Sequence, residues 1–553
     1  MGRPQVLGTG PWTGVLDTTD PFDDSPQLLV NASNGYFIDT RTPGGYYGRP
    51  GFVQGAVSET GLGPASCLYN FEASDGTYIR FFAFKGKLYR VTTSGLTFTG
   101  ATDVTPVGVT IDATDGTTSG GPTARYYMTQ LGGNLVFSDG VNRPWVGSAL
   151  TSTPITAAYI DADGAGGTYA VQGQPTLYQG SLVMLLKSVG TASLNCQPGV
   201  GFLWSEPNQP TVGYEQTGYA DFFNYIQTGS SPLYAALGTN EGLILWRETS
   251  IGIAVGPLNQ LQSSPTTATL SFDVGTKSPA AVTTFGNNVF FVDRIGRPYR
   301  LTLGGGAPEP IWEQMRGQFD RNPSYLNYPD VIAKVAQAVV VPQLKVVLFA
   351  PFSPFPTGNG GNQGPIQPAV AFAFDAGTGI YLGTWTLRDG TPTFECMAVM
   401  RDGNNNPVVC TISNTTTGAD TTCWFNHQTV LSAAQWYDTD ALSANTSMRP
   451  TVTTGRLGYN ADAVWNARRG TAIVMSSSAV TATVTTPYQS ATAEGTVTPP
   501  TSDDSTSRIP FGLDIRSARG MQFALTPSTL TNQWGIQRVE VVATPSAARV
   551  EDA

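Results

Sequence analysis

The sequence predicts an all-β protein whose main body is a β-propeller of about six or seven blades. A glycine followed by a run of β-branched and aromatic residues recurs along the chain. Only 13% of the residues are charged, whereas the chain has 63 glycines and 39 prolines. Ordinary globular proteins have about 25% charged residues. This composition favours short strands joined by many turns and disfavours helices.

The repeating unit has a nearly constant length. It starts at Gly86, Gly133, Gly180, Gly242 and Gly286, so successive starts lie 47, 47, 62 and 44 residues apart. A propeller blade of four strands takes about 40–50 residues. Each interval therefore predicts one blade, and the long third interval predicts an insertion, at residues 196–234.

Residues 1–60 are predicted to be an extended N-terminal arm. Residues 17–40 contain acidic residues and prolines with one short alternating stretch, and residues 41–52 are dense in turn formers. Such a segment cannot build a core alone. We expect it to wrap the main body or a neighbouring subunit, with Tyr36, Phe37 and Phe52 as anchors.

Residues 61–435 are predicted to form the propeller-like domain. In residues 78–91, the turn Lys85-Gly86-Lys87 separates two strands rich in aromatic and β-branched residues, which predicts a hairpin. Similar hairpins are expected at 369–385 and 395–413. Residues 196–234 and 353–368 form long inserted loops, which we expect to contact partners.

Residues 436–553 are predicted to form a C-terminal antiparallel β-sandwich. Five stretches, at 471–475, 479–486, 508–517, 519–527 and 534–544, have the alternation and β-branched residues of strands. Short strands separated by turn residues over about 100 residues are typical of such a domain.

The charge balance argues against a protein that grips nucleic acid. The chain has 40 Asp and Glu residues against 30 Lys and Arg, whereas proteins that hold phosphates use Lys and Arg. The start of the chain lacks the apolar core of a signal peptide. No run of about 18 apolar residues predicts a membrane-spanning helix. We therefore expect synthesis in a cytoplasm and no export by a signal peptide.

No catalytic, cofactor or metal-binding residue is predicted. The single histidine, His427, lies four residues after Cys423, but a catalytic Cys-His pair needs a favoured thiolate within hydrogen-bond reach. A zinc site would need three or four clustered ligands. The other cysteines are Cys67, Cys196, Cys396 and Cys410. No two cysteines form a C-x-x-C pair, so free buried thiols are expected.

Two acidic patterns could suggest a site, but turn chemistry explains both better. Propeller enzymes that cleave sugars use carboxylates at the central channel, and aspartates recur here at Asp139, Asp273, Asp293, Asp375 and Asp402. Asp beside Gly usually bonds its own backbone in a turn. Residues 161–167 place two aspartates near glycines but lack the later Glu of an EF-hand loop.

Arg-Pro dipeptides recur at Arg49-Pro50, Arg143-Pro144 and Arg297-Pro298. Proline cannot donate to a strand ladder, so it belongs at the first residue of a strand or at an edge. The apolar stem of each arginine is expected to pack over a neighbouring aromatic ring. These dipeptides therefore predict blade edges.

Several segments together resemble the tail nozzle or tail-hub proteins of short-tailed bacteriophages. They are the arm that ends in RPGF (49–52), the hairpin at 286–301, the block LWSEPNQP (203–210) and the terminal strands at 519–527 and 534–544. The resemblance covers most of the chain. It implies a virion structural protein, and it brings no catalytic residues.

The resemblance also implies partners. Six copies are expected to form a ring that conducts DNA along its axis, bound to a head-to-tail adaptor and to tail fibres or spikes. An acidic or neutral channel wall would not hold the phosphates. The arm or the sandwich is expected to supply the burial between subunits. Two other classes of function stay open: a propeller hydrolase that degrades glycans, and a module that binds glycans on a host surface.

Overall fold

The computed structural model describes most of the chain as strands. The described residues are 3–17, 28–37, 44–49, 52–60, 66–112, 126–216, 231–258, 266–321, 336–350, 370–386, 396–414, 420–426, 438–439, 445–446, 451–457, 463–475, 480–486, 489–491, 496–497, 507–527 and 535–547, apart from residues 11, 85, 95–96, 195 and 519. Within them the helical elements are α3 (Arg316–Arg321) and the 3-10 turns η1 (Pro279–Ala281) and η2 (Ile311–Met315). The predicted all-β class is confirmed.

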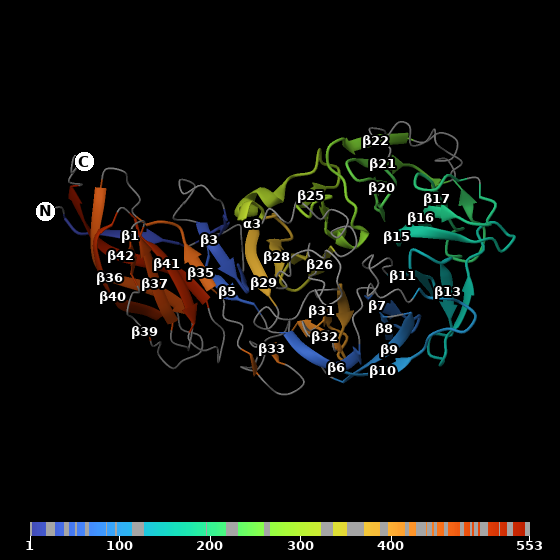
Figure 1. The fold of residues 1–553 in the computed structure, drawn as a ribbon, viewed down its shortest axis with the longest axis horizontal. Helices are drawn as coiled ribbons and strands as arrows, with labels where there is room; N and C mark the ends of the chain where they lie inside the picture. Colours follow the sequence, from blue (N-terminus) through green and yellow to red (C-terminus); the bar gives the residue numbers. More distant parts are fainter. Residues whose placement is uncertain are drawn as a thin grey trace, which may run out of the picture.

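The molecule has two parts that lie side by side. Figure 1 shows many small sheets arranged around a centre on one side, and two larger sheets on the other. Both ends of the chain lie at the far end of the two larger sheets. We call the first part the small-sheet region and the second part the terminal sheets.

Four sheets of the small-sheet region have four strands each, and neighbours in the sheet are neighbours in the chain. They are β7 (Ser66–Glu72), β8 (Tyr78–Phe84), β9 (Lys87–Ser94) and β10 (Thr97–Asp103); β11 (Tyr127–Leu131), β12 (Asn134–Ser138), β13 (Trp145–Ser148) and β14 (Thr156–Tyr159); β15 (Tyr169–Tyr178), β16 (Ser181–Val189), β17 (Phe202–Trp204) and β18 (Glu215–Gln216); β19 (Ala235–Gly238), β20 (Leu243–Trp246), β21 (Ile251–Val255) and β22 (Thr266–Ser271). All pairings within them are antiparallel.

Three further strand groups complete this region. They are β23 (Thr283–Phe285), β24 (Asn288–Val292) and β25 (Pro298–Thr302); β26 (Gln337–Val341), β27 (Val346–Ala350), β28 (Val370–Asp375) and β29 (Tyr381–Thr386); and β30 (Cys396–Arg401), β31 (Pro407–Asn414) and β32 (Asp420–Asn426). The last group gains an outer strand from the start of the chain, because β6 (Phe52–Thr60) pairs antiparallel with β32. The short β33 (Asp438–Thr439) and β34 (Asn445–Thr446) extend beyond β6.

The second strand of each sheet is packed on both faces, which explains the repeat. Leu135 and Phe137 of β12 pack in one core cluster with Phe81 of the preceding sheet. Val136, between them, packs in another cluster with Leu182 of the following sheet. A strand buried on both faces has a continuous apolar run instead of an alternating one. The runs after Gly133, Gly180, Gly242 and Gly286 are therefore second strands of sheets stacked between others, whereas the run after Gly86 is β9, the third strand of its sheet.

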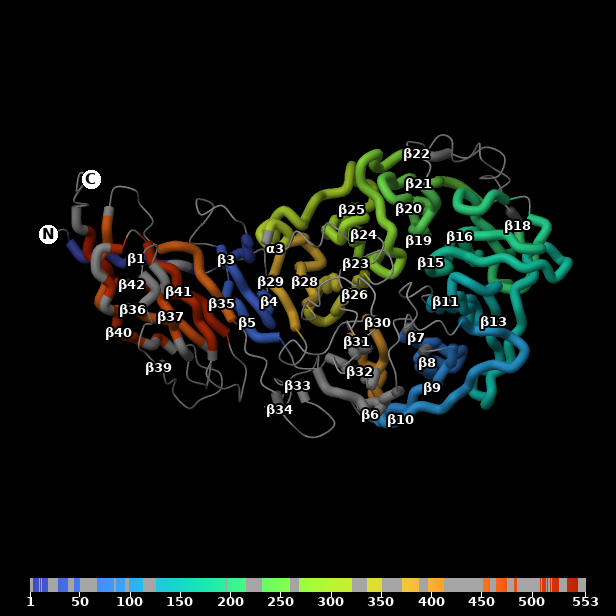
Figure 2. The backbone as a smooth tube through the Cα atoms, in the orientation of Figure 1, coloured from blue at the N-terminus to red at the C-terminus, as the bar shows by residue number. Residues whose placement is uncertain are grey.

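The first strands of the sheets face the centre of the small-sheet region (Figure 2). In chain order, contacts join β7 to β11, β11 to β15 and β15 to β19, and contacts also join β23 to β26 and β26 to β30. The turn η1 contacts both β15 and β26. β30 in turn contacts β7, the first strand of the first sheet. The last strand group therefore lies against the first.

The terminal sheets are built from both ends of the chain. One sheet has the order β4-β5-β42-β36-β40, with β1 also paired to β42. The other contains β3-β35-β41-β37-β38, with β2 on β3 and β39 on β37. Their strands are β1 (Gln5–Thr9), β2 (Gly14–Val15), β3 (Leu28–Ser33), β4 (Gly35–Phe37), β5 (Tyr46–Gly48), β35 (Thr451–Thr454), β36 (Ala463–Met475), β37 (Val480–Thr486), β38 (Gln489–Ala491), β39 (Thr496–Val497), β40 (Ser507–Ala518), β41 (Gln522–Pro527) and β42 (Gly535–Ala547).

Aromatic and aliphatic side chains fill the space between these two sheets. Phe511 of β40 meets Phe523 of β41 edge to face, with ring centroids 6.0 Å apart. Val539 and Val541 of β42 and Leu525 of β41 belong to the same buried cluster. The two terminal sheets therefore share one hydrophobic core.

The described strands of residues 1–60 are distributed over three sheets of their own chain. Strands β1, β4 and β5 lie in one terminal sheet, β2 and β3 in the other, and β6 in the small-sheet region. Trp12, Leu29 and Tyr46 are fully buried, and Phe37 is 3% exposed. Of the expected anchors, Phe37 is thus buried and Tyr36 half-buried, while the side chain of Phe52 lies outside the described residues. The arm thus buries several apolar side chains against its own subunit, although Val6 of β1 is 64% exposed.

The arm also joins the two parts of the molecule through buried polar contacts. Ser33 pairs with Thr384 at the edge of β29. Asn34 accepts a hydrogen bond from the backbone N–H of Thr386 at 2.9 Å, and Arg49 donates to the Thr386 carbonyl at 2.6 Å. The indole of Trp385 donates to the carbonyl of Gly35 at 2.8 Å. These bonds satisfy the polar groups that the junction buries.

Candidate functional site

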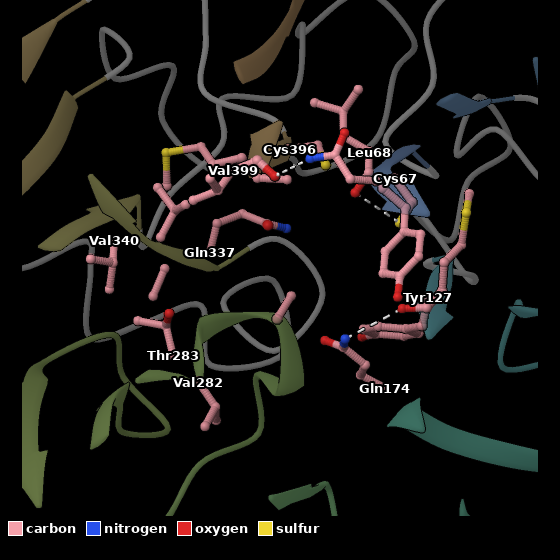
Figure 3. Close-up of a pocket in the computed structure, with 18 of the residues that line it drawn as sticks. Cys67, Leu68, Tyr127, Gln174, Val282, Thr283, Gln337, Val340, Cys396 and Val399 are labelled. Carbon is pink, nitrogen blue, oxygen red and sulfur yellow. Dashed lines mark hydrogen bonds between the residues drawn. The ribbon is translucent and has the colours of Figure 1, made fainter. Parts of the chain in front are cut away.

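The principal candidate site is a cavity at the centre of the small-sheet region. It has a volume of about 500 Å³ and lies among the first strands of the sheets (Figure 3). Its walls come from β7, β11, β15, η1, β23, β26 and β30. A cavity of about 300–1,000 Å³ is the usual size of a small-molecule site.

The described lining of this cavity has no Asp, Glu, Lys, Arg or His side chain. Most of the lining is aliphatic or aromatic, as at Val282, Val340 and Tyr127. The polar members are amides, hydroxyls and the thiols of Cys67 and Cys396. The described walls therefore contain no carboxylate or imidazole that could act as a general acid or base.

Side-chain amides on the first strands bond the backbone of the neighbouring sheets. Asn70 of β7 donates to the carbonyl of Val399 at 3.1 Å and accepts from the N–H of Arg401 at 3.2 Å. Gln174 of β15 donates to the carbonyl of Met128 at 3.4 Å. These side-chain hydrogen bonds link β7 to β30 and β15 to β11, which are not paired as strands. They therefore hold the walls of the cavity in place. The sequence analysis missed them, and polar residues inside otherwise apolar strands were the available signal.

Two of the recurring aspartates, Asp139 and Asp293, are buried inside turns. Asp139 accepts from the N–H groups of Val141 and Asn142 at 2.9 and 2.7 Å. Asp293 accepts in the same way from Ile295 and Arg297 at 3.0 and 2.9 Å. The exposed fractions of Asp139 and Asp293 are 2% and 4%. Each carboxylate thus accepts hydrogen bonds from two backbone N–H groups of its own turn, as aspartates in turns commonly do.

The other recurring aspartates follow the same pattern or are exposed. Asp402, 1% exposed, accepts from the N–H groups of Asn404 and Asn406, both at 2.8 Å. Asp375 accepts from Gly377 and Thr378 at 3.0 and 2.6 Å. Asp273 is exposed. None of the five recurring aspartates is among the described residues that line the cavity. The structure supports the interpretation of these residues as turn formers.

Burial and backbone contacts shift the pKa of two carboxyl groups in opposite directions. Burial raises the pKa of Asp293, although Arg297 lies 2.7 Å away and favours the charged form. In the loop at 161–167, N–H donors of Ser193, Ala165 and Gly167 lower the pKa of Asp163 to about 2. The loop is thus held by its own backbone. Among the described residues there is no group of three His, Cys, Asp or Glu side chains that could hold a metal.

The Arg-Pro dipeptides have the predicted packing. Arg49 lies over the ring of Trp385, Arg143 over Tyr159 and Arg297 over Trp312, at 5.8, 4.7 and 4.7 Å from the ring centroids. Pro298 is the first residue of β25, as the missing N–H of proline requires. The arginines therefore join neighbouring elements and do not form a ligand site.

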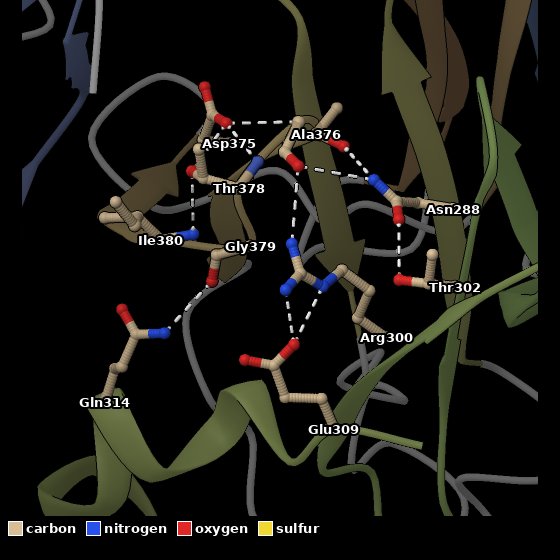
Figure 4. Close-up of polar contacts among 11 residues, drawn as sticks. Asn288, Arg300, Thr302, Glu309, Gln314, Asp375, Ala376, Thr378, Gly379 and Ile380 are labelled. Carbon is tan, nitrogen blue, oxygen red and sulfur yellow. Dashed lines mark hydrogen bonds and ion pairs between the residues drawn. The ribbon is translucent and has the colours of Figure 1, made fainter. Parts of the chain in front are cut away.

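A polar cluster joins the three-stranded sheet to the next sheet (Figure 4). Arg300 pairs with Glu309 and donates to the carbonyl of Gly377 at 3.3 Å. Asn288 donates to the carbonyl of Ala376 at 3.2 Å. The backbone of Arg300 also bridges to Glu309, after which η2 and α3 follow in place of a further strand. This cluster is structural, because Asn288 and Arg300 bond the turn at the end of β28 and Glu309 holds Arg300.

Parts of other predicted features can be placed as well. The stretch 196–234 was predicted to be an inserted loop, but it contains β17 and β18, the last two strands of their sheet. Between them, the buried Ser205 accepts from the N–H of Leu182 at 3.0 Å, and Asn208 donates its N–H to the Gly180 carbonyl at 2.8 Å. This portion is fixed on the β15–β16 hairpin. His427, the side chain of Cys423 and residues 353–368 lie outside the described residues. Cys67, Cys196, Cys396 and Cys410 are thiols, as expected.

No helix among the described residues is long and apolar enough to cross a membrane. No family model matches the sequence, and no curated protein matches it.

Comparison with solved structures gives similarities of low score. One is the computationally designed protein Ika8, with a TM-score of 0.34 and 9% identity over 68% of this chain and 100% of that chain. Another is an exo-β-1,3-galactanase from Phanerochaete chrysosporium solved with β-1,3-galactotriose, with a TM-score of 0.27 and 11% identity over 82% of this chain and 99% of that chain. A second structure of an exo-β-1,3-galactanase from this organism, solved with galactose, has a TM-score of 0.25 and 10% identity over 75% and 95% of the two chains. At these scores the similarity says nothing about function.

Proposed function

We propose that this chain is a structural protein of a bacteriophage tail, of the nozzle or hub class, which assembles into a ring of about six copies and catalyses no reaction. The observation that favours this role over hydrolysis is the uncharged lining of the central cavity in the described residues. Sugar cleavage on such a scaffold needs two carboxyl groups about 5–9 Å apart. The recurring aspartates instead accept bonds from their own turns.

In this proposal the small-sheet region is a propeller of seven blades, one for each strand group. The seventh blade has three strands from residues 396–426 and an outer strand from β6. Because β6 comes from the start of the chain and lies in the last blade, it would close the circle of blades within one subunit. The contact between β30 and β7 supports this closure, as do two bonds of 2.5 Å from Arg80 to the carbonyls of Arg401 and Asp402.

The path of DNA in this proposal lies between subunits. The central cavity of one subunit has a volume of about 500 Å³. A duplex has a major groove that alone is about 12 Å wide and 8.5 Å deep, so it cannot pass through the middle of one chain. The axis of an assembled ring is the remaining route, and the net charge of −10 per chain disfavours retention of phosphates there.

The test is the assembly state of the purified full-length protein. Negative-stain electron microscopy and mass photometry are expected to show closed rings of uniform size. Monomers at micromolar concentration would contradict the proposal. In parallel, incubation with capsular polysaccharides of candidate host bacteria is expected to release no new reducing ends. Turnover, abolished by mutation of a carboxylate pair, would establish the hydrolase alternative instead.

A further inference from the structure

We propose that the central cavity is a binding site for a small neutral carbohydrate, a role separate from assembly. Its size, its mixture of apolar walls and a few amide and hydroxyl groups, and the absence of formal charge among its described lining residues point to this ligand class. Neutral sugars present apolar C–H faces and many hydroxyls, and they carry no charge that the protein would have to balance.

The polar groups of the site come from different walls. Figure 3 shows the carboxamides of Gln174 and Gln337 directed into the space from β15 and β26, with Thr283 on a third wall. Gln337 is 4% exposed, so its amide is held in a defined position. Amides provide both donors and acceptors, and a threonine hydroxyl provides both as well. Such groups match hydroxyls, which also donate and accept.

The aromatic rings of the site supply apolar surface. Tyr126 uses its hydroxyl outside the cavity, since this group accepts from the N–H of Gly86 at 2.7 Å and donates to the carbonyl of Asp112 at 2.5 Å. Tyr69 likewise accepts from the backbone of Gln130, and burial raises the pKa of its phenol. The ring of Tyr126 packs in the core between two sheets, with its centroid 5.5 Å from that of Phe137, and Tyr69 packs against the same core. Tyr127 of β11 lies on the cavity wall (Figure 3), where an aromatic ring is suited to pack against the C–H face of a sugar.

The absence of charged side chains from the described cavity lining is expected to select neutral over charged sugars. A carboxylate, phosphate or ammonium group that enters an uncharged, largely apolar site loses hydration without gaining an ion pair. Uronic acids, sugar phosphates and amino sugars are therefore excluded. Entry from solvent is possible beside Thr284, a lining residue whose side chain is exposed.

The site is tested by ligand-observed saturation-transfer NMR and calorimetry on the full-length protein. The probes are the methyl glycosides of glucose, galactose, mannose and rhamnose, and their charged counterparts are glucuronate, galacturonate and glucosamine. At least one neutral glycoside is expected to bind with a Kd in the millimolar range or tighter, and the charged counterparts at least tenfold more weakly. Binding of no neutral glycoside, or equal binding of neutral and charged probes, would overturn the proposal.

Variants of three lining residues test whether the sugar binds in the cavity. Thr283→Val removes a hydroxyl at constant shape, and Gln174→Ala removes an amide; each is expected to weaken binding at least fivefold. Ala338→Leu adds bulk to a lining residue that is 8% exposed and is expected to abolish binding. The matched control is Gln130→Ala, because Gln130 also bonds a neighbouring sheet, at Glu72, but is not among the lining residues. Unchanged affinity in Thr283→Val and Ala338→Leu would show that the sugar binds elsewhere.

The assembly state of each variant separates this inference from the proposed function. Rings that form normally while Ala338→Leu loses the sugar would support both statements. Rings without any sugar binding would overturn the inference alone, and sugar binding by a monomer would overturn the assembly role alone.

Discussion

The small-sheet region and the terminal sheets differ in how far apart their strand partners lie in the sequence. In the small-sheet region, Phe137 pairs with Trp145 and Phe291 with Tyr299, a few residues away. In the terminal sheets, Val6 pairs with Val542 and Ala32 with Val452. Local pairings lose little chain entropy on closure, whereas distant ones lose more. Apart from the pairing of β6 with β32, the first region can therefore form from its own hairpins, while the second needs both ends of the chain.

Deletion of residues 1–49 is expected to have the largest effect, and it tests whether the terminal sheets alone depend on the start of the chain. The deletion removes β1 to β5 from the terminal sheets, together with the buried Trp12, Leu29 and Tyr46, but keeps β6 on β32. Residues 451–547 are expected to lose protection in hydrogen–deuterium exchange, while β7–β25 keep theirs. Deletion of residues 1–10, which removes β1 alone, is the milder control. Full protection of residues 451–547 in the longer deletion would show that the arm is dispensable for this fold.

That expectation changes the role first predicted for the arm. The sequence left two partners open for residues 1–60, the main body or a neighbouring subunit, and the arm or the C-terminal sandwich was expected to supply the burial between subunits. Because Trp12, Leu29 and Tyr46 are fully buried within their own chain, the deletion is now expected to damage the fold first.

A matched pair of core truncations compares the two regions directly. Phe523 in the terminal sheets and Phe291 in the small-sheet region are both fully buried. Each Phe→Ala change is expected to cost about 3–5 kcal/mol in its own region, since a cavity remains. Differential scanning calorimetry should show one transition lowered by Phe523→Ala and another by Phe291→Ala. A single transition that shifts equally in both variants would mean that the two regions unfold as one.

A smaller effect separates the turns of the small-sheet region from ordinary surface. Asp402→Ala leaves the N–H groups of Asn404 and Asn406 without their carboxylate acceptor. The expected loss of stability is about 1–3 kcal/mol, the range for buried donors left unsatisfied. Asp273→Ala, at an exposed aspartate, is the control and is expected to change stability by less than about 0.5 kcal/mol. Equal effects in urea unfolding would refute the structural role of the turn aspartates.

The smallest expected effect is on thermal stability at acid pH, through the carboxyl group of Asp163. The pKa of Asp163 is lowered from 3.8 to about 2 by backbone N–H donors. A carboxyl whose pKa is lower in the folded state stabilises the protein above its unfolded pKa, and this contribution is lost as pH falls through the folded pKa. Between about pH 4 and about pH 2, the Tm of Asp163→Asn should therefore fall slightly less than that of the natural protein. An identical pH profile would argue against the shift.

Local sequence patterns determined much of this protein. The glycine-bounded apolar runs indicated strands stacked between sheets, because a run such as that of β24 is buried on both faces. The Arg-Pro dipeptides indicated strand starts with an arginine over a ring, as at Arg297 and Trp312. The aspartates beside glycine indicated turns, as Asp139 shows. Each of these properties depends on neighbours in the chain, so the sequence alone was sufficient.

Only the tertiary structure decided which distant segments pair as strands and which of them line the cavity. No local pattern shows that residues 52–60 pair with residues 420–426, or that strands at both ends of the chain share one sheet. The cavity is likewise formed by first strands from several sheets, so its uncharged lining appears only when Gln174, Thr283 and Gln337 are brought together. Pairing over such distances is decided by the burial of whole faces and not by the preference of any single segment.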